Sequence, residues 1–162
     1  MIPIQNIYYM LSYAFQILNE QGYRNIATEQ FNNTAELMAA ILEKGIANQL
    51  KRGLCKEYIP QTEALSSLRG KIDIAESIKT QSMLRKQLIC TYDEFSVNST
   101  MNQIIKSTVE LLLCSNISKK RKKNLRKLMI YFGEVDFIDL HTVNWNVQYN
   151  RNNQTYRMLI SI

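Results

Sequence analysis

The stretch that decides the fold runs from Cys90 to Leu113 and reads Cys-Thr-Tyr-Asp-Glu-Phe-Ser-Val-Asn-Ser-Thr-Met-Asn-Gln-Ile-Ile-Lys-Ser-Thr-Val-Glu-Leu-Leu-Leu. Its first half alternates between two faces, as a strand does. Its second half has apolar residues at helical spacing, behind a cap at Asn98 or Ser99. A short acidic turn at Asp93 and Glu94 joins the two. The stretch therefore predicts a strand that feeds a buried helix, a rigid corner against which both flanks pack.

The flanks supply further elements around this corner. The buried face expected for the corner helix is Met101, Ile104, Ile105, Thr108, Leu111 and Leu112. The other expected elements are a helix at 4–19 ended by Gly22, a helix at 34–52 opened by Asn33 and closed by Gly53, an extended region at 54–74 in which Pro60 indicates an edge strand or a bulge, a short helix at 75–84, a basic helix from Ser118 to Phe132, a strand at 135–140, and a last helix capped by Asn152 or Asn153.

This order of elements indicates an α+β fold, with several helices packed on a small, mainly antiparallel sheet. The 162 residues are expected to form one domain. The last apolar pattern stops at Ile162 after about two turns, and helices that short are marginal alone. We therefore expect the chain to be truncated at its C-terminus.

Composition argues against several classes of protein. No apolar run approaches the roughly 20 residues that cross a bilayer, and the first residues do not resemble a signal peptide. A cytoplasmic protein with no membrane partner is therefore expected. Cys55, Cys90 and Cys114 are widely spaced, and with a single histidine they form no zinc-binding pattern. We expect these cysteines to be reduced and mostly buried.

The positive charge is concentrated in one block. The net charge is +6, and seven cations fall within nine residues: Lys119, Lys120, Arg121, Lys122, Lys123, Arg126 and Lys127. Twenty lysines and arginines less these seven leave thirteen, against fourteen acidic residues. Two interpretations stay open, a nucleic-acid-binding surface and a solvated helix face that Leu125, Leu128 and Met129 anchor to the core.

The chain carries none of the common catalytic signatures. Its five glycines are too scattered for a phosphate-binding loop, and no G-x-S-x-G elbow occurs. The Asp-x-Lys and Glu-x-Lys triplets of metal-dependent nucleases are absent too. Asp93 and Glu94 would point to opposite sides of a strand. We therefore expect them to accept backbone N–H groups at the start of the next helix rather than to hold a metal ion.

Two further clusters have a structural and a functional interpretation. Tyr8, Tyr9 and Tyr13 lie at helical spacing and are expected to line the core rather than to stack on bases. Arg69-Gly70-Lys71 is either a contact for an anion or a partner, or a bend that needs glycine between two extended segments. The bend is the simpler interpretation.

Five stretches also carry a family pattern. They are Ile2-Pro3-Ile4-Gln5-Asn6-Ile7-Tyr8-Tyr9-Met10-Leu11-Ser12-Tyr13-Ala14, then Lys51-Arg52-Gly53-Leu54, then Leu68-Arg69-Gly70-Lys71-Ile72-Asp73, then Tyr92-Asp93-Glu94-Phe95 leading to Asn102-Gln103-Ile104-Ile105-Lys106-Ser107-Thr108, and Tyr149-Asn150-Arg151 to Tyr156. In this order they resemble the N-terminal part of McrC, the nuclease subunit of the McrBC modification-dependent restriction systems. Gln5, Phe15 and Gln103 depart from the family, which commonly has arginine, tryptophan and arginine there.

The resemblance implies an adaptor rather than an enzyme. In the family, the N-terminal part of McrC inserts into an McrB AAA+ GTPase ring, stimulates GTP hydrolysis and couples it to cleavage of modified DNA. The PD-(D/E)xK nuclease domain lies beyond the region that this chain matches. The resemblance therefore implies no catalytic residue, metal or cofactor here, with Mg²⁺ and GTP belonging to the missing nuclease domain and to the partner.

Contact residues follow only from charge and position within the matching stretches. A positive charge beside a transferring phosphoryl group accelerates hydrolysis, as arginine fingers do. The candidates for contact with an McrB-like ring are Lys51, Arg52, Arg69 and Lys71. Two alternatives remain, a DNA-binding module that uses the helix at 119–127, and a decayed remnant that folds but has no activity.

Overall fold

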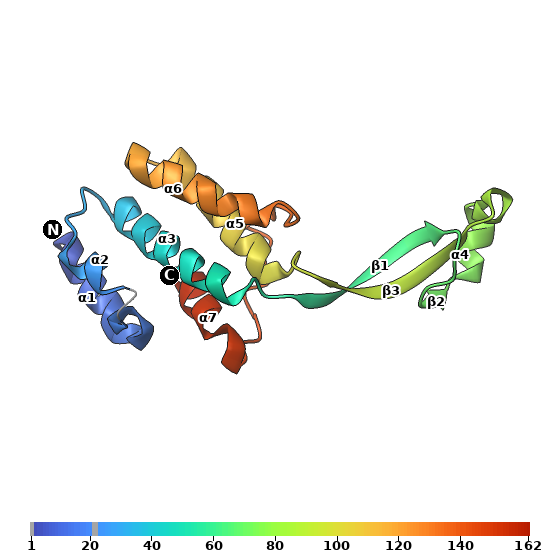
Figure 1. Ribbon diagram of the computed structural model, residues 1–162, viewed down its shortest axis with the longest axis horizontal. Coiled ribbons are helices and arrows are strands. Elements are labelled where there is room, and N and C mark those ends of the chain that lie inside the picture. The colour runs from blue at the N-terminus through green and yellow to red at the C-terminus, as the bar shows by residue number, and fades with distance from the viewer. Residues whose placement is uncertain (1, 21–22) are drawn as a thin grey trace. The chain divides into compact units, whose positions relative to one another are not determined.

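The computed structural model describes residues 2–20 and 23–162, apart from the side chain of Asn152 (Figure 1). The chain divides into two compact units. The first, called here the helical unit, comprises Met1–Cys55 and Thr100–Ile162. The second, the ribbon unit, comprises Lys56–Ser99. Helices and an antiparallel sheet are both present, so the α+β class is confirmed.

The helical unit is built around its longest helix, α3. Its elements are α1 (Ile4–Ala14), η1 (Gln16–Asn19), α2 (Arg24–Thr28), α3 (Thr34–Arg52), α5 (Thr100–Cys114), α6 (Lys119–Met129), η3 (Ile130–Phe132), η4 (Arg151–Asn153) and α7 (Gln154–Ser161). Helices α5, α6 and α7 all pack on α3 (Figure 1). The core between them is fully buried and mostly apolar, and includes Leu37, Ile41, Ile46, Val109, Leu125, Phe132, Tyr156 and Met158.

Local signals set the ends of α3 as predicted. The Asn33 side chain accepts a hydrogen bond from the backbone N–H of Glu36 at 2.8 Å, which satisfies one of the free donors of the first turn. At the other end Gly53 has φ +91°, a conformation that side-chain-bearing residues avoid. The apolar stripe between these ends is buried at Leu37, Ile41 and Ile46. The prediction of this helix is confirmed at both boundaries.

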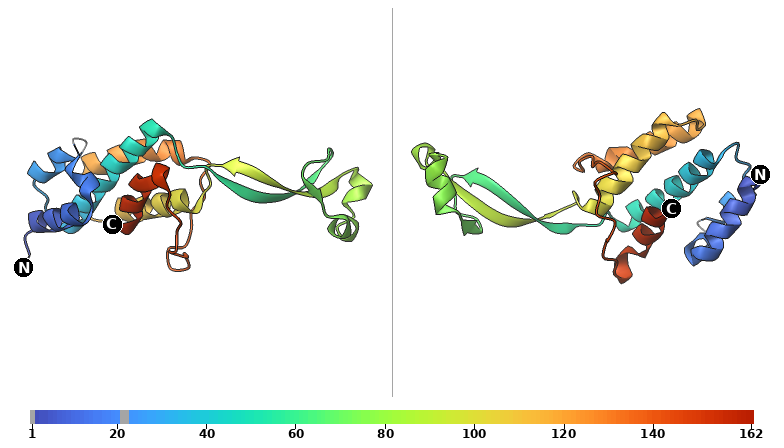
Figure 2. Two further views of the ribbon diagram at one scale, coloured as in Figure 1. Left: turned by 90° about the horizontal axis from the view of Figure 1, so that it is seen from below. Right: turned by 180° about the vertical axis from the view of Figure 1, so that it is seen from behind.

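The ribbon unit is a long two-stranded antiparallel ribbon with a small helical cap at one end. Its elements are β1 (Glu57–Leu65), β2 (Lys71–Ile72), α4 (Ile74–Lys79), η2 (Ser82–Arg85) and β3 (Leu88–Ser96). The strand order is β1-β3-β2, so β1 is an edge strand, as Pro60 predicts. Glu57 lies opposite Ser96 and Leu65 opposite Leu88, without a bulge. Figure 2 shows the two long strands running together from two further sides.

Helix α4 is fastened to β3 by one buried serine. The Ser77 hydroxyl donates to the carbonyl of Asp73 at 2.6 Å and accepts from the backbone N–H of Ile89 at 2.8 Å. The Ser82 hydroxyl donates in turn to the carbonyl of Ser77 at 3.3 Å. Both serines are fully buried. Buried polar groups need such partners, so these bonds hold the cap of the ribbon unit on its sheet.

The predicted helix at 4–19 is wrong in its second half. Helix α1 ends at Ala14, and Phe15 is extended with φ −124° and ψ 95°. The short turn η1 follows and places Leu18 in the core, where its carbonyl accepts from the Tyr8 hydroxyl at 3.1 Å. The helical period thus breaks at Phe15, and a contact between residues ten positions apart holds the turn that follows. The predicted stop at Gly22 lies outside the described residues.

Two segments that connect the predicted elements also differ between the prediction and the structure. Asp93 and Glu94 are not a turn before the helix, because β3 continues through them to Ser96 and leaves both side chains exposed. Residues 135–140 do not form a strand. Their backbone is held by helix α5 instead, since the Ile138 N–H donates to the Ser107 hydroxyl at 2.9 Å and Lys106 donates to the carbonyl of Val135.

Three expectations about burial are wrong as well. Tyr8 is buried as expected, but Tyr9 is exposed and Tyr13 is 93% exposed. Leu111 is exposed, and Val109 takes the buried place on α5 because three helices surround that element. Cys90 is buried, whereas Cys114 is exposed.

Candidate partner-binding surface and charge cluster

The capped end of the ribbon unit exposes an unusual number of large apolar side chains. Five residues of one short segment are each more than half exposed: Leu68, Ile74, Ile78, Met83 and Leu84. Ile74 and Ile78 are four residues apart on α4, so they share a face. Helix α4 contacts η2, which carries Met83 and Leu84. Single exposed apolar residues are ordinary, whereas several on one short segment make that segment a candidate contact surface. We call these five residues the apolar end.

Two of the predicted contact residues lie beside the apolar end. Gly70, between Arg69 and Lys71, has φ +66°, and a Cβ there would come within 2.3 Å of the Thr91 carbonyl oxygen. Only glycine allows this close approach, so the predicted bend is confirmed. Lys71 then pairs with Thr91 in the sheet. Arg69 lies in the turn and Lys71 is the first residue of β2, and both side chains are exposed.

The position of Arg69 is held by an aromatic ring. Its guanidinium lies 3.9 Å from the centre of the Tyr92 ring, a favourable cation–π contact. The Tyr92 hydroxyl donates to Glu63 Oε2 at 3.3 Å. Desolvation and the Glu63 carboxylate raise the pKa of Tyr92. Arg69 is thus an exposed cation with a defined orientation, as a contact to an anionic group requires.

Lys51 and Arg52 belong to the other unit. Both are exposed in the last turn of α3, where positive charge also favours the helix dipole. The four predicted contact residues therefore form two separate pairs, Lys51 with Arg52 and Arg69 with Lys71. Their role in binding a ring stays a prediction.

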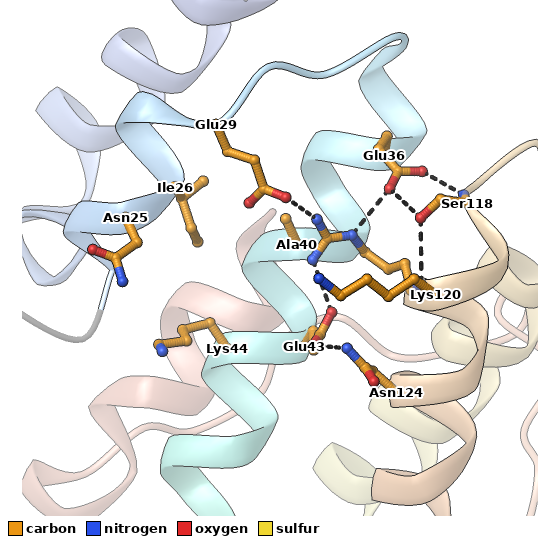
Figure 3. A pocket seen from close by; sticks show the side chains of 11 residues that line it. Asn25, Ile26, Glu29, Glu36, Ala40, Glu43, Lys44, Ser118, Lys120 and Asn124 are labelled. Atoms are coloured by element: carbon orange, nitrogen blue, oxygen red, sulfur yellow. Dashed lines mark hydrogen bonds and ion pairs between the residues drawn. The ribbon is translucent and has the colours of Figure 1, made fainter.

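Arg121 differs from the other cations of the basic block. Its guanidinium makes three ion pairs, with Glu29 at 2.7 Å, Glu36 at 3.1 Å and Glu43 at 2.8 Å. Figure 3 shows these three acidic side chains converging on one point beside α6. The side chain of Arg121 is only 13% exposed. Its charge is therefore neutralised inside the helical unit, and its interpretation as part of a free cationic surface is corrected.

The same cluster caps α6. Ser118 accepts from the backbone N–H of Arg121 at 3.3 Å, and its own N–H donates to Glu36 Oε2 at 2.7 Å. Desolvation would raise the pKa of Glu36, but the two hydrogen bonds from Ser118 and the contact with Arg121 outweigh it and lower that pKa. Desolvation would likewise lower the pKa of Arg121, and its bonds to Glu36 and Glu43 raise it instead. Glu36 thus stays a carboxylate at neutral pH.

The remaining cations of the block face outward. Lys119, Lys120, Lys123, Arg126 and Lys127 are exposed, and Lys122 is half-buried. Leu125 is fully buried, with Leu128 and Met129 half-buried beside it. The predicted apolar anchor of this helix is therefore confirmed. Nucleic-acid binding by the outward face stays a prediction.

Sequence reasoning missed two clusters in the helical unit. Glu36 and Glu43 are seven residues apart on α3, which places them on one helical face, and this spacing is a usable signal. Glu29 carries no such signal. The second cluster joins two of the family-like stretches and the residue that follows a third: the Tyr156 hydroxyl donates to Asn102 Oδ1 at 2.6 Å and accepts from the Cys55 N–H at 2.9 Å. Nothing local predicts this buried network.

The charge cluster borders a polar cavity of about 280 Å³, lined among others by Asn25, Lys44 and Lys120 (Figure 3). Within residues 2–20 and 23–162, no three His, Cys, Asp or Glu side chains are grouped as metal ligands. None of the helices in that part of the chain is both long and apolar enough to cross a bilayer. We assign no reaction chemistry to either cluster.

Both the sequence and the fold of this chain are similar to those of known proteins. The chain is 30% identical over 169 residues to the type IV methyl-directed restriction enzyme EcoKMcrBC of Escherichia coli (strain K12), covering 99% of this chain and 47% of that protein. The structure superposes on the cryo-EM structure of the Thermococcus gammatolerans McrBC complex with a TM-score of 0.68, at 21% identity, over 98% of this chain and 49% of that one.

A second solved structure is similar in the same way. It is a half-complex from a tetradecameric assembly of Thermococcus gammatolerans McrB AAA+ hexamers with bound McrC, with a TM-score of 0.65, 20% identity, and coverage of 91% of this chain and 38% of that one. At such identity the two structures establish the fold. This chain spans about half the length of the relatives that it matches.

The family comparison covers nearly the whole chain. The family described as McrBC 5-methylcytosine restriction system component matches residues 5–162. That range includes α1, the ribbon unit with its apolar end, the Arg121 cluster and α7. The chain therefore belongs to the McrBC restriction system component family, and within it resembles McrC.

Proposed function

We propose that this chain is the ring-docking and coupling part of an McrC-like restriction subunit. It binds an McrB-like AAA+ GTPase ring, stimulates GTP hydrolysis and couples that hydrolysis to DNA cleavage, without breaking bonds itself. Cleavage and its Mg²⁺ are assigned to the nuclease part of such a subunit, and GTP to the ring. The role is a defence against modified foreign DNA.

The observation that carries the proposal is the capped end of the ribbon unit. It presents five exposed apolar side chains next to two exposed cations, Arg69 and Lys71. A few anchor side chains that are buried in pockets supply most of the affinity of a protein interface. Oriented cations supply charge complementarity and, near a phosphoryl group, rate enhancement. A solved relative of this fold is McrC bound to McrB hexamers, which supports a ring as the partner.

The test uses the purified chain and an McrB-type ring, with the GTPase rate followed against the concentration of the chain. Leu84→Asp should raise the half-saturating concentration at least tenfold, because a charge would be buried at the apolar contact. Ile130→Asp is the matched control, since Ile130 is 76% exposed and Leu84 81%, but Ile130 belongs to the helical unit. It should leave half-saturation unchanged.

The cations are tested in the same assay. If Arg69 stabilises charge at the reacting phosphate, Arg69→Gln should lower the maximal stimulated rate more than tenfold while half-saturation changes little. Lys51→Gln with Arg52→Gln tests the other pair in the same way. A folded chain that leaves the GTPase rate of the ring unchanged contradicts the proposal and favours the remnant interpretation.

A further inference from the structure

The outward face of α6 is a continuous strip of positive charge. At 100° per residue, Lys119, Lys120, Lys123, Arg126 and Lys127 fall within one arc of about 120°. They span nine residues, or about 12 Å along the axis. All five are exposed, and Leu125 on the opposite side is fully buried. We call these five residues the basic strip.

The cluster of Arg121 with Glu29, Glu36 and Glu43 lies on the opposite side of α6 from the basic strip. Arg121, Ser118, which donates to Glu36, and Asn124, which donates to Glu43 Oε1 at 2.8 Å, all bind acids of the α2–α3 region on the inner side of α6. These three carboxylates thus form their ion pairs with Arg121. In the described part of the chain, the ion pairs of α6 all belong to Arg121.

The basic strip is electrostatically unfavourable in the chain without a bound partner. Lys119, Lys123 and Lys127 repel one another at four-residue spacing. The N-terminus of α6 already has a negative charge beside it, because Ser118 donates to the Glu36 carboxylate on the other side of the helix. A row of phosphates along the basic strip would relieve the repulsion between the lysines.

The residue types in α6 favour one polyanionic partner, duplex DNA, over single-stranded nucleic acid and a membrane surface. Lys119–Met129 contains no aromatic residue on which unpaired bases would stack, as single-stranded nucleic acid requires. A membrane-surface helix needs an apolar face free to enter lipid, whereas the apolar side of α6 is occupied by the core. Duplex DNA offers one charge per about 1.7 Å of axis and needs only cations.

We propose that the basic strip of α6 binds the phosphate backbone of duplex DNA without reading its sequence. The contact is independent of the proposed ring docking, because it lies in the helical unit and is measured without a ring. It would hold the subunit on the DNA that the family restricts, whatever modified base is recognised elsewhere.

The test is fluorescence anisotropy of a labelled 30-base-pair duplex with the full chain across a salt series. Five phosphate contacts predict a slope of log affinity against log salt of about −4.5, and hence a roughly 500-fold loss of affinity from 50 to 200 mM salt. Lys123→Gln with Lys127→Gln should reduce the steepness of that slope by about 2.

The matched control is Lys51→Gln with Arg52→Gln, which removes the same charge from exposed helical positions of the same unit. It should leave the slope unchanged, with circular dichroism reporting that all variants fold. Three results would overturn the proposal: no binding at 50 mM salt, an equal loss in the control, or binding to phosphatidylglycerol vesicles but not to DNA.

Discussion

Arg121 is the residue on which the packing of α6 depends. It enters a mostly buried position, and removing an arginine from water is costly unless its donors are satisfied. Its Nε and both terminal nitrogens each bind a carboxylate oxygen within 3.1 Å. The three acids come from the end of α2 and from α3, so one side chain links three elements.

Replacing Arg121 should therefore destabilise the helical unit. Arg121→Gln leaves Glu36 and Glu43 close together without a counter-charge, and we expect the free energy of unfolding to fall by about 2–3 kcal/mol, less than for a fully dry pair because Glu29 is half-exposed. Urea denaturation measures this. Arg126→Gln, an exposed change on the same helix, should stay within about 0.5 kcal/mol. Equal effects would show that the cluster contributes nothing.

The lowered pKa of Glu36 predicts a pH dependence. A carboxylate whose pKa is lower in the folded state than in the unfolded state adds stability above the unfolded value, near 4.5. That contribution is lost as the pH falls below 4.5 and through the lower folded-state pKa. The stability difference between the natural chain and Glu36→Gln should thus shrink between pH 6 and pH 3. A difference independent of pH, measured by urea denaturation, would contradict this origin.

At the scale of elements, helix ends and turns form at the residues that favour them. Helix α3 follows Asn33 and stops before Gly53, and the turn before β2 uses the left-handed conformation of Gly70. The ends of α3 depend on residues within four positions, and the turn depends on the positive φ that glycine adopts readily, so the sequence alone predicts them. The segment at 135–140 is the contrary case, because side chains of α5 bind its backbone and no local pattern shows that.

Gly70→Ala should loosen the end of the ribbon unit. Alanine is strained by about 1–3 kcal/mol at φ +66°, and its Cβ would also meet backbone of β3 at Thr91. The backbone N–H of Asp73, which donates to the Ile89 carbonyl at 2.9 Å, should then exchange its hydrogen at least tenfold faster. Gly53→Ala is the control: it has positive φ but open space around it, and it should leave Asp73 exchange unchanged.

At the scale of the whole molecule, each unit has its own set of buried contacts. The core of the helical unit is supplied by its own helices, and Tyr156 fixes the backbone of Cys55 by a hydrogen bond within that unit. The ribbon unit begins and ends at neighbouring points, since Glu57 pairs with Ser96. A short linker can therefore join the two ends of the helical unit between which the ribbon unit is inserted in the sequence.

Replacing residues 57–96 by a short glycine–serine linker should leave the helical unit folded. We expect its helical circular dichroism and cooperative thermal unfolding to persist, because closing a short loop costs little. Stimulation of a GTPase ring should be lost, whereas binding of duplex DNA should remain. Full stimulation by the shortened chain would show that docking resides in the helical unit instead.

The sequence by itself determined the α+β class, the ends of α3, the edge position of β1, the glycine bend and the family, because each depends on local chemistry or on residues in a fixed order. Only the tertiary structure decided that Arg121 turns inward while its lysine neighbours face water, and that Tyr13 is exposed while Tyr8 is buried. The physical reason is distance along the chain. Arg121 and Glu36 are 85 residues apart in the sequence. The apolar periodicity of one helix does not indicate which polar side chain of another helix it will bury.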